Sequence, residues 1–364
     1  MTPPRRVLVC GAGVMGAATA YFLARRGVAV TLVERTAVAC AASGKSGGFL
    51  ALDWCDGSPL GPLARASFAL HAELARELGT DCDYRRMDTF MLAALERGTI
   101  DGGHRVSAPR WLDGAGVVTA ALGSTETTAQ VHPELFTKAL VAAARARGSD
   151  LRIGVVEALV RSHGAVTGVK VDGEVLEGDA VVLAMGPWTG RVAGRLLPRV
   201  RGLKGYSVTL DAPRVPAHAL FVEYRTGDGL SLEPEIFPRP DGEVYVCGMA
   251  DPAPLPDSPE AVTVNEESCA VLARAAGRVA TSLAGARITR RQACYRPVTD
   301  DGLPLIGRVP GVTGAYVATG HGPWGILNAP ATGLALAELI TEGSASSVDL
   351  GPFEPARLPA SRAG

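Results

Sequence analysis

The sequence predicts an α/β protein in which one domain is built on a parallel sheet and a second, α+β domain on a mainly antiparallel sheet. Two observations support this prediction. Apolar runs of the strand type at residues 7–10, 180–184 and 315–319 each lead into a glycine-rich turn, a pattern typical of parallel strands followed by helices. By contrast, strand-like runs alternate with proline-rich loops over residues 206–284, which favours antiparallel pairing.

The run at residues 7–10 begins the most specific pattern in the chain. The glycines that follow it have GxGxxG spacing: Gly11, Gly13 and Gly16. A helical stretch with small residues comes next, then a second apolar run, residues 28–33, which ends on Glu34. The first glycine permits the tight turn, the second lets backbone approach a pyrophosphate, and the third lets helix and strand pack closely. The pyrophosphate would lie at the positive end of the helix dipole, and Glu34 would accept hydrogen bonds from ribose hydroxyls. This order predicts a Rossmann-like dinucleotide-binding unit.

The remaining elements follow from apolar periodicity and from their end signals. A helix predicted over residues 62–79 ends at Gly79, a residue typical of helix C-termini. Further helices are predicted over residues 133–147, 266–283 and 327–341. Strands are predicted over residues 89–95, 151–156, 165–171, 180–184, 245–247 and 315–319.

The nucleotide-binding domain is predicted to be discontinuous, because the last part of the chain returns to the strand, glycine turn and helix of the first. Its pieces are residues 1–52, 130–205 and 286–345. The second domain is predicted to comprise residues 53–129 and 206–285. Residues 346–364 are assigned to a C-terminal tail, whose last dozen residues read as loose.

The composition limits the kinds of binding partner and the cellular compartment that we expect. The 364 residues carry a formal net charge of −1 and the pI is about 6.6, so the charge favours neither nucleic acid nor an anionic membrane as partner. The seven cysteines are odd in number and form no CxxC pair, which favours reduced thiols and a cytoplasmic protein. Histidines and cysteines do not cluster at zinc-ligand spacing, so no metal is expected.

A signal peptide or membrane anchor is an alternative interpretation of the N-terminus. Arg5 and Arg6 precede an uncharged stretch over residues 7–24, and small residues follow at 39–42. The glycines of the GxGxxG pattern lie inside that stretch, and Glu34 follows where a dinucleotide site needs an acid. We therefore interpret the segment as part of the nucleotide site and expect no membrane partner.

Further motifs follow one another along the chain in a recognisable order. After the GxGxxG unit come AASGKSGGFL (41–50), QVHPELFTKALVAAARARG (130–148), VVLAMGPWTG (181–190), CYRPVTDDGLPLIG (294–307) and ATGHGPWGILNAPATGLALAELI (318–340). Together they resemble the D-amino-acid-oxidase superfamily of FAD enzymes, in its glycine oxidase and monomeric sarcosine oxidase branch. The resemblance covers nearly the whole chain. Through GKSGGFLALDW and GHGPWGILNAPATG it is closest to a group of poorly characterised oxidoreductases within that family.

The resemblance implies that the dinucleotide is FAD, bound noncovalently. The late turn at residues 320–325 precedes a helix, and N–H groups at a helix start can stabilise the negative charge on a reduced flavin. A nicotinamide dehydrogenase has no need of such a turn. By resemblance, the loop at 41–50 lines the flavin ring and Val156 meets the adenine through its backbone, whereas each glycine taken singly could be an ordinary turn. The predicted cofactor-binding residues are Gly11, Gly13, Val14, Met15, Gly16, Glu34, Arg35, Ser43, Lys45, Gly47, Gly48, Val156, Gly186, Trp188, Gly320, Gly322, Gly325 and Ile326.

The resemblance also implies a reaction at a carbon bonded to nitrogen. A hydride passes from that carbon to flavin N5, the imine is hydrolysed, and oxygen accepts the electrons with release of hydrogen peroxide. The expected substrate is a small primary or secondary amino acid. The alternatives are an NAD-linked dehydrogenase, or a flavin-binding assembly or regulatory protein with little turnover. The sequence leaves the oligomeric state open.

Arg296 is the main candidate for binding the substrate. It lies in an RPxTxDGxPxIG pattern, where glycine oxidase has its substrate-binding arginine, and a guanidinium matches a carboxylate in two-point geometry. The alternative is a structural ion pair with Asp300 or Asp301.

Further candidates stand near the same site. Glu235 replaces a tyrosine of glycine oxidase and could pair with a second amino group or a cationic substrate; the alternative is an exposed loop carboxylate. His321 and Trp324 adjoin the late turn, and packing is the alternative for both. A second arginine of glycine oxidase is missing there, which argues against glycine as substrate. Lys45 could contact the flavin or be a simple loop charge, and Cys294 is one place out of register with the cysteine that attaches flavin in sarcosine oxidases.

Overall fold

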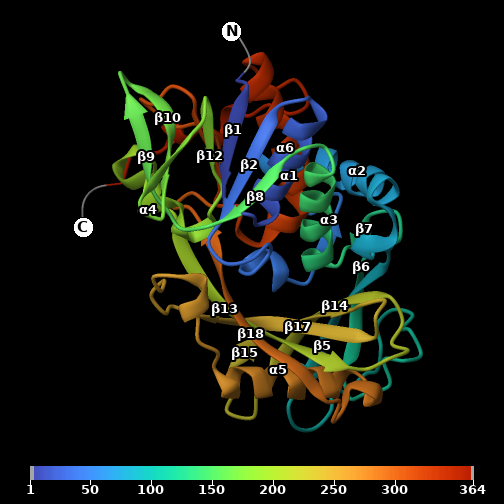
Figure 1. Ribbon diagram of the computed structural model, residues 1–364. Coiled ribbons are helices and arrows are strands. Elements are labelled where there is room, and N and C mark those ends of the chain that lie inside the picture. The colour runs from blue at the N-terminus through green and yellow to red at the C-terminus, as the bar shows by residue number, and fades with distance from the viewer. Residues whose placement is uncertain (1–3, 362–364) are drawn as a thin grey trace.

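The computed structural model describes residues 4–361, apart from the side chains of residues 80 and 81. The upper half of the molecule in Figure 1 is built on a six-stranded sheet with strand order β19-β20-β12-β1-β2-β8. β19 runs antiparallel to β20 and the other neighbours are parallel, as the apolar runs predict. The strands are β1 (Arg6–Cys10), β2 (Ala29–Glu34), β8 (Asp150–Ile153), β12 (Ala180–Leu183), β19 (Leu305–Arg308) and β20 (Ala315–Thr319).

Both faces of this sheet are covered, which explains why its strands are continuous apolar runs. Val7 and Val9 of β1 pack towards four helices, and Leu8 and Cys10 pack towards a three-stranded antiparallel sheet (Figure 1). The helices are α1 (Val14–Arg25), α2 (Leu60–Leu78), α3 (Pro133–Arg145) and α6 (Gly325–Glu342), and the small sheet contains β9 (Val156–Ser162), β10 (Ala165–Val171) and β11 (Glu174–Glu177). The short helix α4 (Thr189–Ala193) follows β12.

Helix α6 contains a proline whose missing hydrogen bond is replaced from α2. Pro330 has no N–H to donate to the carbonyl of Ile326. Instead, Nε2 of the fully buried His71 lies 2.9 Å from that carbonyl oxygen and 3.2 Å from the carbonyl oxygen of Leu327. The N–H of Ala331 donates to Oγ of Ser67 at 3.1 Å. Since carbonyls only accept, Nε2 of His71 carries the proton.

The lower half in Figure 1 is a larger sheet with order β18-β13-β17-β16-β14-β5-β6, and β15 pairs with β14. Its neighbours are antiparallel except β14 and β5, so the prediction of a mainly antiparallel sheet is confirmed. Helix α5 (Glu266–Val279) packs on its outer face. The strands are β5 (Asp88–Leu95), β6 (Val117–Gly123), β13 (Arg201–Asp211), β14 (His218–Arg225), β15 (Ser231–Leu232), β16 (Glu235–Pro238), β17 (Glu243–Asp251) and β18 (Ile288–Val298). A small sheet adds β3 (Phe49–Ala51), β4 (Arg85–Arg86) and β7 (Thr128–Gln130).

The division into two domains stays a prediction. The predicted boundary at residue 286 assigns β18 to the first domain, although β18 pairs with β13 along most of its length. We propose that the second domain includes β18, because that pairing makes β18 the edge strand of the larger sheet.

The expectation that the last dozen residues, 353–364, are loose is wrong for residues 353–357, and its final part, residues 362–364, lies outside the described residues. Phe353 is only 1% exposed and packs in the core beside the helices. The Arg357 guanidinium donates to Asp301 at 2.8 Å. Apolar side chains spaced along this segment fasten it to the first sheet and its helices.

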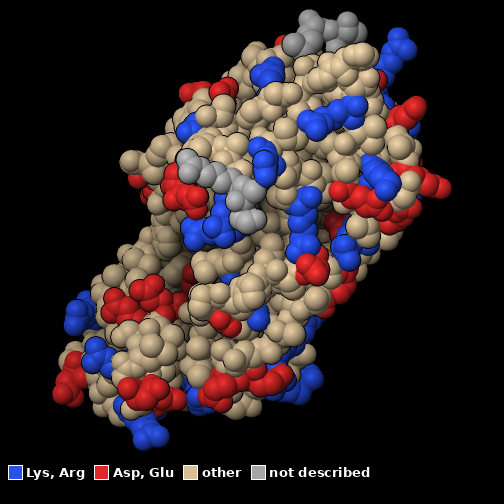
Figure 2. All heavy atoms as spheres, turned by 90° about the vertical axis from the view of Figure 1, so that its left-hand side faces the viewer, with Lys and Arg blue, Asp and Glu red and all other residues tan. Residues whose placement is uncertain are grey.

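The surface carries both signs of charge. Acidic and basic side chains are interspersed over the face drawn in Figure 2, in keeping with the net charge of −1. Among the helices of residues 4–361, none combines the length and the apolar character that crossing a membrane requires.

His71→Ala is expected to lower the free energy of unfolding by about 2 to 3 kcal/mol. The change leaves two buried carbonyls of α6 without their donor. Urea unfolding followed by circular dichroism measures the effect, with His163→Asn, at an exposed turn residue, as control. Equal stability of the two variants would contradict the role of His71.

Stability is expected to decrease as the pH falls from about 6.5 towards 4. Burial lowers the pKa of His71 and of His132 to about 4 and that of His321 to about 3. In the unfolded chain histidine titrates near 6.5, so between these values the unfolded state binds more protons and low pH favours it. Thermal unfolding at pH 5 and pH 7.5 measures this, and His71→Ala should weaken the dependence by about one proton.

Candidate active site

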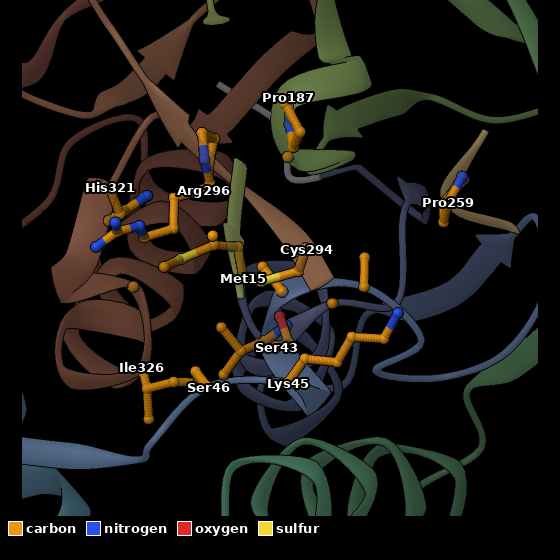
Figure 3. A pocket seen from close by; sticks show the side chains of 18 of the residues that line it. Met15, Ser43, Lys45, Ser46, Pro187, Pro259, Cys294, Arg296, His321 and Ile326 are labelled. Carbon is orange, nitrogen blue, oxygen red and sulfur yellow. The ribbon is translucent and has the colours of Figure 1, made fainter. Parts of the chain in front are cut away.

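A cavity of about 580 Å³ opens at the carboxyl ends of the parallel strands, against the inner face of the larger sheet. Figure 3 shows side chains from distant parts of the chain converging on it, among them Met15 of α1, Ser43 of the segment after β2, and Arg296 of β18. Both sheets therefore contribute to one site. Of the predicted site residues, those that line the cavity are Gly11, Gly13, Val14, Met15, Glu34, Arg35, Ser43, Lys45, Gly47, Gly48, Val156, Gly186, Trp188, Glu235, Arg296, His321, Gly322, Trp324, Gly325 and Ile326.

Two predicted cofactor residues do not line the cavity but permit close packing behind it. A Cβ on Gly16 would lie 1.9 Å from the carbonyl oxygen of Gly11. Gly320 has φ of +82°, and a Cβ there would lie 2.8 Å from Thr299. Gly16 thus has the packing role that its place in the GxGxxG pattern predicts, and a part of either glycine in cofactor binding stays a prediction.

The first glycine turn has the geometry that its spacing predicts. Gly11 has φ of +103°, and a Cβ there would lie 2.5 Å from the carbonyl oxygen of Ala184 on the neighbouring strand's continuation. Its N–H donates to the carbonyl of Val33 at 2.8 Å. The turn is therefore pressed between β2 and β12, and it opens α1 towards the cavity.

Glu34 ends β2 at the rim of the cavity and is only 7% exposed. Its carboxylate accepts hydrogen bonds from the N–H of Ala12 at 2.8 Å and of Thr36 at 3.1 Å. These two bonds fix the carboxylate beside the glycine turn. Its contact with a ribose stays a prediction.

The loop at residues 45–48 has its four carbonyl groups bonded to surrounding protein. The Tyr245 hydroxyl donates to Lys45 O at 2.8 Å, Arg239 Nη2 to Ser46 O at 3.2 Å, Gln130 Nε2 to Gly47 O at 3.4 Å and Val131 N to Gly48 O at 3.0 Å. Across residues 4–361, no acceptor in the chain pairs with the N–H groups of Ser46, Gly47 and Gly48. Because N–H and C=O of a trans peptide point opposite ways, these donors remain available to a ligand.

Arg239 is the buried side chain that organises this loop, and the sequence analysis missed it. It is 5% exposed and its guanidinium lies over the Tyr245 ring, 5.3 Å from the centroid. Nη1 donates to His132 Nε2 at 3.2 Å and pairs with Glu243 at 3.3 Å. The one signal available in the sequence was an arginine directly after the apolar residues 236–238, where a buried arginine would need partners.

Arg296 is free to bind a ligand. Its guanidinium extends over Gly205 of the adjacent strand, where a Cβ would lie 4.0 Å from Nη2. Asp300 pairs with Arg201 at 3.3 Å and Asp301 with Arg357 at 2.8 Å, so the alternative of a structural pair with Arg296 is wrong. In the described part of the chain, no carboxylate lies within 4.0 Å of this guanidinium.

Glu235 lies at the start of β16, deep in the molecule but open to the cavity. The Cys247 thiol donates to its carboxylate at 3.5 Å. Burial raises the pKa of Glu235, while the hydrogen bond from Cys247 and the charge of Arg296 lower it. An exposed loop glutamate was therefore the wrong alternative.

His321 and Trp324 both belong to the wall of the cavity. His321 is 4% exposed, its Nε2 lies 3.1 Å from Oγ1 of Thr332, and burial lowers its pKa to about 3, so it is neutral. Trp324 stands edge-on to Trp54, with ring centroids 6.4 Å apart. Lys45 reaches across the cavity and donates to the carbonyl of Ala293 at 3.3 Å.

Aromatic residues that the sequence analysis did not identify complete the wall. Phe49, Trp54 and Phe221 contact one another with centroids 4.9 to 5.2 Å apart. Phe237 stacks on Phe49 at 5.5 Å. They come from β3, from the loop before α2 and from the larger sheet, so their proximity is a tertiary result without a local signal.

Comparison with known proteins agrees with this geometry. The DAO family model, described as FAD dependent oxidoreductase, matches residues 6–339. A Schizosaccharomyces pombe protein named "Putative oxidoreductase C1F5.03c" is 31% identical, over 98% of this chain and 99% of its own length. Glycine oxidase of Geobacillus kaustophilus is 28% identical, over 97% of both chains. The solved structure of glycine oxidase from Geobacillus kaustophilus matches with a TM-score of 0.78 and 25% identity, over 97% of this chain and 99% of that one.

The family match decides between the two dinucleotides that the glycine turn alone would allow. It assigns FAD, and the alternative of an NAD-linked dehydrogenase is therefore wrong. Since the match spans most of the sequence and both sheets, it applies to the chain as a whole. The chain belongs to the DAO family of FAD-dependent oxidoreductases, within the D-amino-acid-oxidase superfamily that its motifs resemble.

Proposed function

We propose that this enzyme oxidises the C–N bond of a small primary or secondary amino acid to an imine, which water then hydrolyses. The observation that supports this proposal most directly is the unpaired Arg296 guanidinium, which faces the same cavity as the glycine turn. Relatives named glycine oxidase support the substrate class.

The residues of the cavity fit FAD. The turn at Gly11 and Gly13 leaves open backbone for a pyrophosphate, and Glu34 stands where the ribose would lie. The unpaired N–H groups of residues 46–48 and the start of α6 offer donors to the polar edge of a flavin. When bound, FAD supplies a two-electron acceptor for the hydride that leaves the substrate carbon.

Arg296 binds the substrate carboxylate and thereby orients the carbon to be oxidised. A desolvated two-point contact of this kind contributes about 1.5 to 3 kcal/mol. The amine must be neutral to release the hydride, and the proton that it loses on binding passes to solvent. The neutral His321 adds no charge beside the reacting atoms.

We extend the proposal to oxygen as electron acceptor, with hydrogen peroxide as product, to noncovalent FAD and to a cytoplasmic location. Burial raises the pKa of the Cys294 thiol, and since thiolate is the nucleophilic form of cysteine, this supports noncovalent binding. A flavin-binding assembly or regulatory role remains the second candidate. It predicts that no amine or amino acid reduces the flavin without oxygen.

Arg296→Ala is expected to weaken the binding of reactive amino acids about 10- to 100-fold. The substitution removes the charge-assisted contact to the carboxylate, and each 1.4 kcal/mol corresponds to a factor of ten. Anaerobic bleaching of the flavin, titrated with N-alkyl and D-amino acids, measures the apparent Kd. Arg201→Ala, at an exposed arginine of β13, is the matched control. Bleaching by a carboxylate substrate as readily as in wild type would refute the role of Arg296.

Arg239→Gln is expected to weaken FAD binding at least tenfold and to shift the flavin absorption maxima. Without the donor to Ser46 O, the loop no longer presents its N–H groups in a fixed direction. Flavin retention after ultrafiltration and the visible spectrum measure the effect. Arg290→Gln is the control, because Arg290 approaches the same Glu243 from the surface at 3.9 Å. A merely structural role would change the melting temperature but not the spectrum of the bound flavin.

A further inference from the structure

We infer that the cavity contains a second anchoring subsite, formed by Glu235, Phe221 and Trp54, which binds a cationic nitrogen of the substrate. The inference rests on the proposed function, in which Arg296 binds the carboxylate. It narrows the substrate class to amino acids that carry a second, positively charged nitrogen.

Strand pairing brings Glu235 and Phe221 together, and an aromatic contact adds Trp54. Glu235 of β16 is directly opposite Phe221 on β14 and opposite Cys247 on β17. Residues directly opposite each other in an antiparallel pair project from the same face of the sheet. Trp54 packs against Phe221, with ring centroids 4.9 Å apart. All four side chains line the cavity.

The Glu235 carboxylate has no cationic partner of its own. Among residues 4–361, its one hydrogen bond comes from the Cys247 thiol, and no lysine, arginine or histidine nitrogen lies within 4.0 Å of it. Arg296 and Lys45 line the same cavity beyond that distance. A carboxylate removed from water without a counter-ion in contact with it is destabilised, and a cationic ligand beside it would offset that penalty.

The aromatic side chains beside Glu235 favour the same kind of group. Phe49, Trp54 and Phe221 form a contiguous cluster, and Trp324 extends it towards α6. The electron-rich faces of such rings attract ammonium and N-alkylated ammonium groups, most strongly where water is excluded. A carboxylate at the edge of an aromatic wall is therefore suited to a cation with an alkyl stem.

Two opposite charges that share a cavity without pairing fit a substrate that is charged at both ends. The guanidinium of Arg296 takes the carboxylate, and Glu235 takes a positive nitrogen. That nitrogen differs from the one that is oxidised, because the oxidised amine must be neutral to release its hydride. The inferred substrates are basic amino acids of the lysine and ornithine type, with or without N-alkyl groups.

Matched pairs of amino acids test the subsite on the FAD-loaded enzyme. Lysine and norleucine have similar length and differ in the terminal ammonium, and both enantiomers of each are compared. The apparent Kd is taken from anaerobic flavin bleaching, and from the ligand-induced shift of the flavin spectrum where no bleaching occurs. Wild type is expected to bind lysine at least tenfold more tightly than norleucine. Glu235→Gln should abolish that preference and leave norleucine binding unchanged or improved.

Glu223→Gln, an exposed glutamate of β14, is the control and should retain the preference. Phe221→Leu probes the aromatic part independently, and should weaken the binding of trimethyllysine more than that of norleucine.

An equal preference for lysine in wild type and Glu235→Gln, or a preference of the wild type for norleucine, overturns the subsite. If norleucine and other neutral amino acids bleach the flavin in all variants, the proposed function stands without it. If a lysine preference is seen in the spectral shift alone and no amino acid bleaches the flavin, the subsite stands and the proposed oxidation fails.

Discussion

The close backbone contact at the first glycine turn is the constraint on which the rest of the structure depends. Gly16 approaches the Gly11 carbonyl so closely that any side chain would displace α1 from β1. Gly333 makes the equivalent contact between α6 and α1, where a Cβ would lie 2.6 Å from the Ala18 backbone. The N-termini of both helices therefore open on one cavity, and a shift of either helix would move the donors that the cofactor needs.

The two sheets supply different chemistry to that cavity. The parallel sheet contributes backbone donors and the carboxylate of Glu34, which suit a large anionic cofactor. The larger sheet contributes Arg296 and Glu235, which suit a small charged substrate. β18 is the link, since it pairs with β13 in the larger sheet and leads through its following turn to β19 of the other. The strand that carries Arg296 is therefore joined by a single turn to the sheet that lines the cofactor end of the cavity.

The charged side chains in and beside the cavity differ in how they are paired. Arg239 is paired and fixes the loop at residues 45–48, so its burial is compensated within the chain. Arg296 and Glu235 act on each other only at longer range, neither forms an ion pair in the described part of the chain, and both are open to the cavity. Groups left unpaired inside a folded protein are destabilising unless a ligand completes them, which makes these two residues informative about the substrate.

The sequence by itself determined the parallel strands, the glycine turn and the cofactor. The strand Ala315–Thr319 was predicted to the residue, because a strand that is buried on both faces is an unbroken apolar run. The glycine turn could be predicted as well, because its backbone conformation favours glycine and so depends on the local sequence. Only the tertiary structure decided the roles of Arg239, Trp54 and Phe221, and the fastening of the C-terminal segment. The residues that they contact lie far away in the chain. The pairing of β14, β16 and β17 that positions these contacts cannot be predicted from the periodicity of any one segment. Glu235 is an intermediate case, because the resemblance to glycine oxidase placed it near the site, whereas only the fold shows that its carboxylate faces the cavity without an ion-pair partner.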